Sequence, residues 1–482
     1  MWLTGNRMLL TQLIKPFRVC MNSSAEWSSV PVFNPKKILI LTKISRYEFE
    51  RLMNQQLTED ELKQSLQSRG SDYNMLLHFH NLHKKVEASV SNAFEDAGIT
   101  TRVVNRLDYT DETIDWADAV VTTGGDGTYL LAASRIQNND KPVIGFNSDP
   151  NRSKGQLCLP EKYSFNVPEA VEKLLKGMFR WQFRSRIRIT LIGDQVNEPP
   201  VELHDQQLLC PENRYLDIDQ QLRKERPIKQ YVASDDAEKE LDIRVLPVLA
   251  LNEVFIGECV SARVSYLELK FDGSEPIKQK CSGLIVSTGT GSTSWTYNVN
   301  KLTEQSMEQI LNIALEETGQ GTGGTDPKVV SRITEKFNEL LLNDPEDNRL
   351  VYTIRDQLVS PPQSILARIS GFNSKEIITG NISSDFDLDT RMAVSGGGGG
   401  LSMPYNRSAS TNTFMSPNTL KPRGFSQTIH VRSRCFDAFL VIDGGMSFAF
   451  NDGTRAMLEI YPEDALRHVV LHESPVMVTY KH

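Results

Sequence analysis

The sequence predicts an N-terminal Rossmann-like α/β domain followed by a C-terminal β-rich domain. Over the first 150 or so residues, short apolar runs alternate with helical stretches, which is typical of βαβ units and a parallel sheet. The second half instead alternates polar and apolar residues, as antiparallel strands do. Asp-Gly and Asn-Asp-Gly turns of the hairpin type occur within that second half.

In the first half, the apolar run Lys36–Lys43 predicts a buried strand, and Thr58 with Glu61 forms a capping box at the start of a helix. A longer helix is expected from about Asn74 to Ala97, ending near Gly98. The elements expected after it are strands at Thr101–Leu107 and Ala117–Thr123, a helix over about Thr128–Gln137, and a strand in KPVIGFN.

In the second half, strands are expected in Arg184–Gly193, Ala262–Gly273, CFDAFLVIDGG and MSFAFNDGT, with helices around Lys301–Leu315 and Pro327–Leu342. Two polar stretches, at about 195–240 and 385–428, are interpreted as surface insertions. The predicted domain ranges are 35–170 for the α/β domain and 180–475 for the β-rich domain.

Composition limits the partners of the chain. Its 482 residues carry a net charge of −8, so we expect no nucleic acid partner. No apolar run approaches the ~20 residues of a membrane span, so no membrane partner is expected either. The six cysteines are scattered without a C-x-x-C pair, which argues against a disulfide framework or a structural zinc site.

The first residues are basic and acid-free, and their apolar side chains fall on one face of a helix. This make-up predicts a mitochondrial transit peptide over residues 1–30 and import into the matrix; the alternative is a frayed N-terminus. His78, His80 and His83 lie together in an amphipathic pattern, which favours a solvated helix face over a metal site. No metal ligand can be named from the sequence.

The segment VVTTGGDGT contains the strongest chemical signal. A β-branched apolar run ends at Gly124, Gly125, Gly127 and Thr128, so the turn lies between a strand and a helix, where α/β sheets bind ligands. Glycines let another molecule approach the backbone, and the free N–H groups of the helix favour phosphate.

Asp126 lies between these glycines, and a carboxylate repels phosphate. It therefore suits a hydroxyl that must be oriented or deprotonated, or a magnesium ion, and a hydroxyl beside a phosphate indicates phosphoryl transfer. The alternative is an ordinary turn in which Asp126 caps the helix.

Two further elements follow. In LIVSTGTGSTSW, Gly291 exposes a backbone amide while Thr290, Ser292 and Thr293 supply hydroxyls, as in a phosphate or ribose site. Asn252 and Glu253 interrupt an apolar stretch, and burying them is costly unless they are hydrogen-bonded. For that pair, a surface turn is the alternative interpretation.

Together and in this order, GGDGT, Asn252–Glu253 and TGST resemble the motifs of the NAD kinase family, and longer segments are closer still to its animal mitochondrial branch. The resemblance implies the NAD kinase/diacylglycerol kinase-like fold, with the active site between the two domains. It also implies transfer of a phosphoryl group from ATP, with Mg²⁺ or another divalent cation, to the 2′-hydroxyl of the adenosine ribose of NAD, giving NADP.

By the same resemblance, Asp126 matches the catalytic aspartate, and Asn252 and Glu253 match the pair that holds NAD. Thr290 and Thr293 match positions near its adenine and ribose, and Asn147 matches the asparagine after the fourth strand. A homodimer is expected of the mitochondrial branch. Ser282–Gly283, Gly289 and Ser294–Trp295 depart from the commoner pattern, so contacts made there in other members cannot be carried over.

Two alternatives stay open at this stage. Lipid kinases of the diacylglycerol and sphingosine type share the GGDGT turn, although they do not require the later Asn–Glu pair and TGST turn in this form. A non-catalytic NAD(H)-binding sensor on a kinase-like fold is the other alternative, and the intact Asp126 argues against it.

Overall fold

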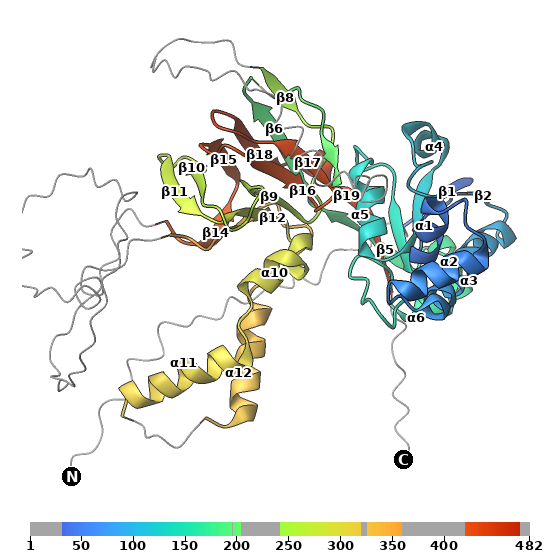
Figure 1. Ribbon diagram of the computed structural model, residues 1–482, viewed down its shortest axis with the longest axis horizontal. Coiled ribbons are helices and arrows are strands. Elements are labelled where there is room, and N and C mark those ends of the chain that lie inside the picture. Colours follow the sequence, from blue (N-terminus) through green and yellow to red (C-terminus); the bar gives the residue numbers. More distant parts are fainter. Residues whose placement is uncertain (1–30, 195, 204–241, 320–324, 359–419, 473–482) are drawn as a thin grey trace, which may run out of the picture.

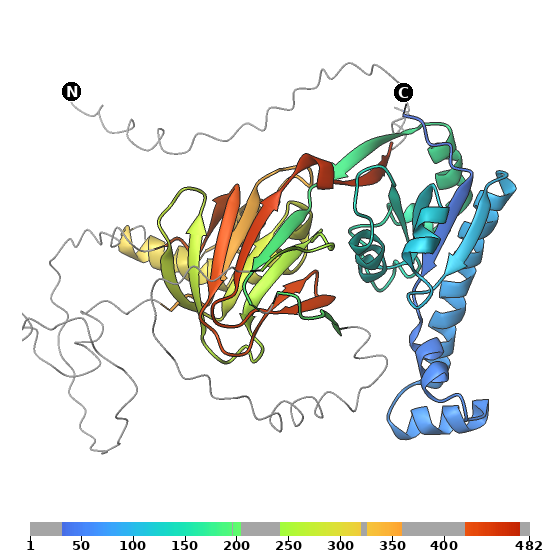
Figure 2. The same cartoon turned by 90° about the horizontal axis from the view of Figure 1, so that it is seen from above.

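The computed structural model describes residues 31–194, 196–203, 242–319, 325–358 and 420–472. The predicted transit peptide at 1–30 lies outside these residues, as do most of the two predicted insertions. Figure 1 shows an α/β half on one side and a β-rich half on the other, as predicted. The turned view in Figure 2 shows the two stacked sheets of the β-rich half beside the α/β half.

The α/β half is built on a six-stranded sheet in the order β2-β1-β3-β4-β19-β5. Its first four strands are parallel neighbours, and the predicted strands and helices of this half are all present within a few residues. Its elements are β1 (Lys37–Thr42), α1 (Arg46–Met53), α2 (Glu59–Ser68), α3 (Tyr73–Asp96), β2 (Thr100–Val104), α4 (Asp111–Trp116), β3 (Ala119–Gly124), α5 (Asp126–Ser134), β4 (Val143–Asn147), α6 (Lys162–Phe165) and α7 (Val167–Leu175).

Helices cover both faces of this sheet because its strands are apolar on both sides. One buried cluster joins the strands to α3 and α7, and a second joins the opposite face to α4 and α5. All of β3 is buried, from Ala119 to Gly124. This packing fixes the carboxyl end of β3, where the glycine-rich turn begins.

The sheet also takes two strands from beyond the predicted range 35–170. β5 (Phe179–Arg184) and β19 (Leu466–Leu471) pair antiparallel with each other, and β19 meets β4 at His468 and Val143. The Tyr129 hydroxyl lies 2.8 Å from His468 Nδ1, and this contact connects α5 to β19. Whether the predicted ranges are independent domains stays a prediction. The sheet of the α/β half nevertheless includes β5 and β19, which come from beyond the range 35–170.

Two antiparallel sheets form the β-rich half, in the orders β11-β10-β15-β18-β6-β8 and β14-β13-β12-β9-β16-β17-β7. Their inward-facing side chains make one shared core. The elements are β6 (Ile187–Ile192), β7 (Val201–Glu202), β8 (Ile243–Val245), β9 (Glu253–Glu258), β10 (Ser265–Phe271), β11 (Ile277–Cys281), β12 (Gly283–Ser287), η1 (Thr290–Thr293), α10 (Trp295–Asn300), α11 (Glu304–Glu317), α12 (Pro327–Glu339), β13 (Leu350–Arg355), β14 (Arg423–Ser426), β15 (Thr428–Ser433), β16 (Ala438–Ile442), β17 (Met446–Ala449), β18 (Arg455–Ile460) and η2 (Pro462–Asp464).

The described ends of the predicted insertions need correction. β7 lies within the stretch predicted as an insertion at 195–240, and β14 lies within 385–428. Both are edge strands of the seven-stranded sheet. An edge strand needs fewer apolar side chains than a central one, which is why these short polar segments did not look like strands.

The histidines of α3 also differ from the prediction. His83 is fully buried, and its Nε2 lies 2.9 Å from the Thr42 hydroxyl. Burial lowers the pKa of His83 to about 3, so the imidazole is neutral. The solvated-face interpretation is therefore wrong for His83. No group of three or more His, Cys, Asp or Glu side chains among the described residues could hold a metal.

Arg186 connects the two halves. It lies between β5 and β6, is fully buried, and donates from Nε to the Asp464 carbonyl and from Nη1 to the Ala133 and Ile136 carbonyls. Ala133 and Ile136 lie at the C-terminal end of α5, where carbonyl groups lack helical partners and a positive charge is favourable. The same helix therefore begins at the glycine-rich turn and ends on the guanidinium of Arg186.

Replacing Arg186 with Met should destabilise the protein by about 3 kcal/mol or more, because buried carbonyls of both halves lose a charged donor. Urea-induced unfolding would measure this loss. The matched control is Arg180→Met on neighbouring β5, where an exposed ion pair with Glu346 at 3.7 Å contributes about 1 kcal/mol or less. Equal stability losses in the two variants would contradict the role assigned to Arg186.

Candidate active site

The glycine-rich turn joins the end of β3 to the start of α5. The helix begins at Asp126, two residues before the predicted start, and Gly125 at the N-cap has no side chain to cap it. The first N–H groups of α5 therefore have no capping side chain and are available to an anion. A Cβ on Gly124 would come within 2.2 Å of the Thr128 hydroxyl oxygen, so the close turn requires glycine there.

Asp126 does not cap its own helix, so that alternative is wrong. Its Oδ1 accepts a hydrogen bond from the Leu157 amide at 2.8 Å, and its Oδ2 accepts one from the Gln156 amide at 3.0 Å. Each carboxylate oxygen has a second lone pair. The carboxylate is thus fixed in orientation and still able to accept a hydrogen bond or a proton from a hydroxyl.

Asn147 shapes the loop that holds Asp126. This buried side chain donates to the Ser153 carbonyl at 2.6 Å and accepts from the Asp149 amide at 3.0 Å. Gly155 has a φ of +61°, and a Cβ there would lie 2.7 Å from Asn147 Nδ2. Asn147 therefore affects the glycine-rich turn indirectly, because it fixes the loop after β4 whose amides bind Asp126.

Asn252 and Glu253 are buried, with 6% and 8% of their surfaces exposed, so the surface-turn alternative is wrong. Asn252 Oδ1 and Glu253 Oε2 have no hydrogen-bond partner although both atoms are buried. Buried polar atoms are nearly always satisfied in proteins, so these two atoms require water or a polar ligand as partner. This pair is the most direct sign of a ligand site in the β-rich half.

Asp443 is the functional residue that the sequence analysis missed. It follows β16 at the tip of a hairpin, with a φ of +48°. Its carboxylate accepts hydrogen bonds from the backbone amides of Leu251, Asn252 and Glu253, at 2.8, 2.8 and 3.0 Å. Asp443 therefore fixes the backbone from which the Asn252 and Glu253 side chains project. The sequence showed only an Asp-Gly turn signal at this position.

The carboxyl groups of Glu253 and Asp443 lie close enough to affect each other. Burial, followed by the charge of Asp443, raises the pKa of Glu253 to about 8. Burial also raises the pKa of Asp443 to about 6, although its three amide donors lower it. Glu253 is therefore largely protonated at neutral pH and can donate a hydrogen bond as well as accept one.

The predicted TGST turn forms the short helix η1, which packs behind Asn252. A Cβ on Gly291 would meet the Asn252 carbonyl oxygen at 2.1 Å, so glycine is required for this contact. The hydroxyls of the turn are engaged within the protein: Thr290 accepts from Arg184 at 3.3 Å, Ser292 donates to the Gly289 carbonyl at 2.6 Å, and Thr293 donates to the Thr290 carbonyl at 3.1 Å.

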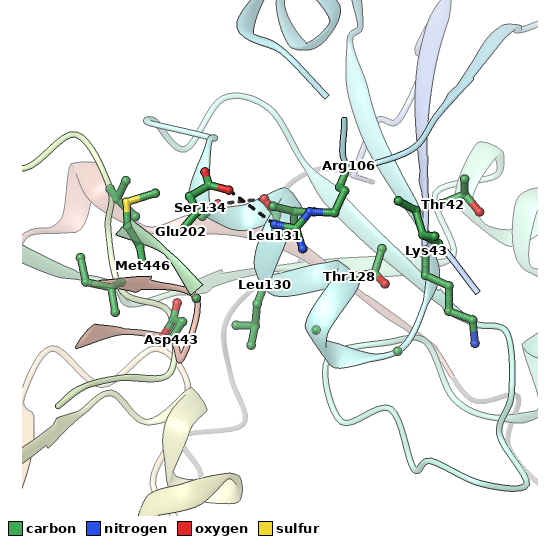
Figure 3. Close-up of a pocket in the computed structure, with 16 residues that line it drawn as sticks. Thr42, Lys43, Arg106, Thr128, Leu130, Leu131, Ser134, Glu202, Asp443 and Met446 are labelled. Atoms are coloured by element: carbon green, nitrogen blue, oxygen red, sulfur yellow. Dashed lines mark hydrogen bonds and ion pairs between the residues drawn. The ribbon is translucent and has the colours of Figure 1, made fainter. Parts of the chain in front are cut away.

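A cavity of about 370 Å³ separates the two halves at this site. Gly125, Gly127 and Thr128 line it from the α/β half, and Asp443 and Met446 line it from the β-rich half (Figure 3). An ion pair between Arg106 and Glu202, at 3.4 Å, also connects the two halves there. The cavity lies between the GGDGT turn and the hairpin whose Asp443 holds the backbone of Asn252 and Glu253. Its lining does not include the side chains of Asp126, Asn252 and Glu253, nor Asn147 or η1.

Comparisons with known proteins show that the chain is similar to NAD kinases. A family model described as the ATP-NAD kinase N-terminal domain matches residues 38–175. "NAD kinase 2, mitochondrial" of Rattus norvegicus is 38% identical over 444 residues, covering 92% of this chain and 89% of its own. The Homo sapiens protein of the same name is also 38% identical, covering 92% of this chain and 85% of its own.

Among solved structures, an NAD kinase from Archaeoglobus fulgidus in complex with ATP aligns with 14% identity and a TM-score of 0.40. The alignment covers 90% of this chain and 93% of that one. A TM-score of 0.40 is too low to support a shared fold by itself.

The pH dependence of stability should depend on Glu253. Since its pKa is higher in the folded than in the unfolded protein, the folded state binds the extra proton, and this stabilisation is lost as pH rises toward 8. Relative to Glu253→Gln, the wild type should lose about 1 kcal/mol per pH unit between roughly pH 5 and 8. Urea unfolding at several pH values measures this, with the exposed Glu112→Gln as control; parallel profiles for wild type and Glu253→Gln would contradict it.

Proposed function

The chain belongs to the NAD kinase family, and we therefore propose that it transfers a phosphoryl group from ATP to the 2′-hydroxyl of the adenosine ribose of NAD, giving NADP. The observation that carries the proposal is one cavity with two chemically different walls. One wall presents Gly125, Gly127 and Thr128 of the amide-rich turn; the other presents Asp443, whose carboxylate binds the backbone amides of Asn252 and Glu253.

Each wall has a separate task in the reaction. Asn252 and the protonated Glu253 hold the ribose hydroxyls of NAD, because their free atoms can both accept and donate hydrogen bonds. The N-terminus of α5, with Gly125 and Gly127, receives phosphate oxygens through its amides. These contacts place the acceptor hydroxyl beside the phosphoryl group, which is the main requirement of phosphoryl transfer.

Asp126 orients the 2′-hydroxyl and takes its proton as the oxygen attacks phosphorus. A bond forms between that oxygen and the γ-phosphorus, and the bond between the γ-phosphorus and the bridging oxygen of ATP breaks, which leaves ADP. The amides of Gln156 and Leu157 fix the orientation of the carboxylate. Proton transfer to a positioned side chain of this kind contributes about 10²- to 10⁴-fold to the rate.

The remaining predicted residues have supporting tasks in this proposal. The η1 turn packs behind Asn252 and borders the adenosine of NAD; its residues are Thr290, Gly291, Ser292 and Thr293. Asn147 fixes the conformation of the loop whose amides orient Asp126. A divalent cation such as Mg²⁺ would supply positive charge to the phosphates of the donor. No group of three or more His, Cys, Asp or Glu side chains that could hold it is found among the described residues.

The alternative of a lipid kinase loses support because the similarity to NAD kinases extends over 92% of the chain, well beyond the GGDGT turn.

The relatives are named as mitochondrial enzymes, which supports a mitochondrial location. We propose that residues 1–30 direct import into the matrix and that the enzyme works there as a homodimer. Fusing residues 1–30 to a fluorescent protein should send it to mitochondria; a cytosolic signal would overturn the targeting proposal.

Replacing Asp126 with Asn should reduce NADP formation by about 10²-fold or more, because an amide cannot take the proton. The assay uses protein lacking the first 30 residues, with NAD, ATP and magnesium, and a parallel reaction that offers a lipid instead of NAD. Asp115→Asn, an exposed aspartate on α4, is the matched control. Unchanged NADP formation by Asp126→Asn would sink the mechanism, and a wild type that makes no NADP would favour the sensor alternative.

A further inference from the structure

Arg184 is a buried cation for which the protein supplies few partners. It is the last residue of β5, and only 8% of its surface is exposed. A guanidinium carries five N–H donors, and arginine is almost never buried unless it is paired. Here Nη1 donates to the Thr290 hydroxyl at 3.3 Å, whereas Nε is buried without a hydrogen-bond partner. Among the described residues, no ion pair and no second hydrogen bond engages Arg184.

Arg186, two residues further along, shows how a structural arginine at this junction is held. Its guanidinium donates to three backbone carbonyls, which belong to both halves of the molecule. Arg184 has no such carbonyl acceptor in the part of the chain that the structure describes. A long hydrogen bond to one neutral hydroxyl offsets little of the cost of burying a charge. The contacts within the protein therefore do not account for the burial of Arg184.

The position of Arg184 relates it to both groups that the proposed reaction brings together. β5 lies where the two halves meet (Figure 1), and Thr290 belongs to the η1 turn behind Asn252. Burial lowers the pKa of Arg184, whereas Tyr129 and then Asp126 act to raise it. The Asp126 carboxylate is therefore within electrostatic range of the guanidinium. Arg184 is thus near the proposed proton acceptor and also touches the turn proposed to border the adenosine.

The proposed product brings a negative charge close to Asp126. In the proposed mechanism the 2′-oxygen lies beside the Asp126 carboxylate, and a phosphate monoester carries about −1.5 to −2 charges at pH 7. These two negative groups repel each other, so the phosphoryl group on the 2′-oxygen needs a positive partner. Arginine suits this task because it stays protonated and its planar fork can bind two phosphate oxygens at once.

We propose that Arg184 contacts the phosphoryl group as it arrives on the 2′-oxygen and donates hydrogen bonds to its oxygens. The inference rests on the proposed kinase activity for the identity of the substrate. Arg184 takes no part in the proton transfer; it offsets the repulsion from Asp126 and thereby distinguishes NADP from NAD. None of the sequence motifs indicated Arg184, because its unused donors become evident only from its burial.

The test compares the binding of NAD and NADP, which differ only in the 2′-phosphate. Calorimetry measures both dissociation constants for the wild type, Arg184→Met and Arg184→Lys. Methionine fills the volume of the side-chain stem without a charge, whereas lysine keeps the charge and loses the planar fork. The matched control is Arg180→Met on the same strand, where the side chain is 46% exposed and pairs with Glu346. The thermal midpoint of each variant reports folding.

Arg184→Met should weaken NADP binding about tenfold or more, as expected for the loss of a charge-assisted hydrogen bond. Its NAD binding should stay near that of Arg180→Met, and Arg184→Lys should lose less NADP affinity than Arg184→Met. An equal loss of NAD and NADP affinity would overturn the proposal, because Arg184 would then only shape the site. Unchanged NADP binding by folded Arg184→Met would overturn it as well. The comparison needs no turnover, so it decides the role of Arg184 even if the wild type binds NAD without making NADP.

Discussion

Arg186 donates hydrogen bonds to carbonyl groups of both halves of the molecule, and the shape of the cavity between the two halves depends on that connection. The same helix, α5, accepts this guanidinium at its C-terminal end and presents the glycine-rich turn at its N-terminal end. Tyr129 ties the middle of the helix to His468 of β19. With both contacts in place, α5 cannot slide or tilt without breaking buried hydrogen bonds, so Asp126 keeps a fixed position relative to the opposite wall.

The local features of this fold could be predicted from the sequence because each depends on neighbouring residues. Apolar runs mark β1, β3 and β4, and the capping box at Thr58 and Glu61 is present at the start of α2. The GGDGT turn lies between a buried strand and a helix, as its residue types required. Asn252 and Glu253 were recognised because two polar residues stand out in an apolar stretch, and both are buried.

Features that depend on distant residues could not be predicted in this way. Asp443 holds the amides of Asn252 and Glu253 from about 190 positions away, and its local pattern is that of any Asp-Gly turn. His83 was misjudged because its polar side chain was taken as a sign of a solvated face; its spacing from Val86 and Val90 puts it on the buried face of α3, where the Thr42 hydroxyl is its partner.

The position of β19 has a consequence for the order in which the chain can fold. β19 lies between β4 and β5, so β5 has no neighbour in its sheet until residues 466–471 have been synthesised. Before that, β4 is an edge strand with unpaired backbone groups, and such edges invite pairing with other chains. The six-stranded sheet of the α/β half is therefore complete only at the end of synthesis. Until then the nascent chain exposes the edge of β4, which favours protection by chaperones.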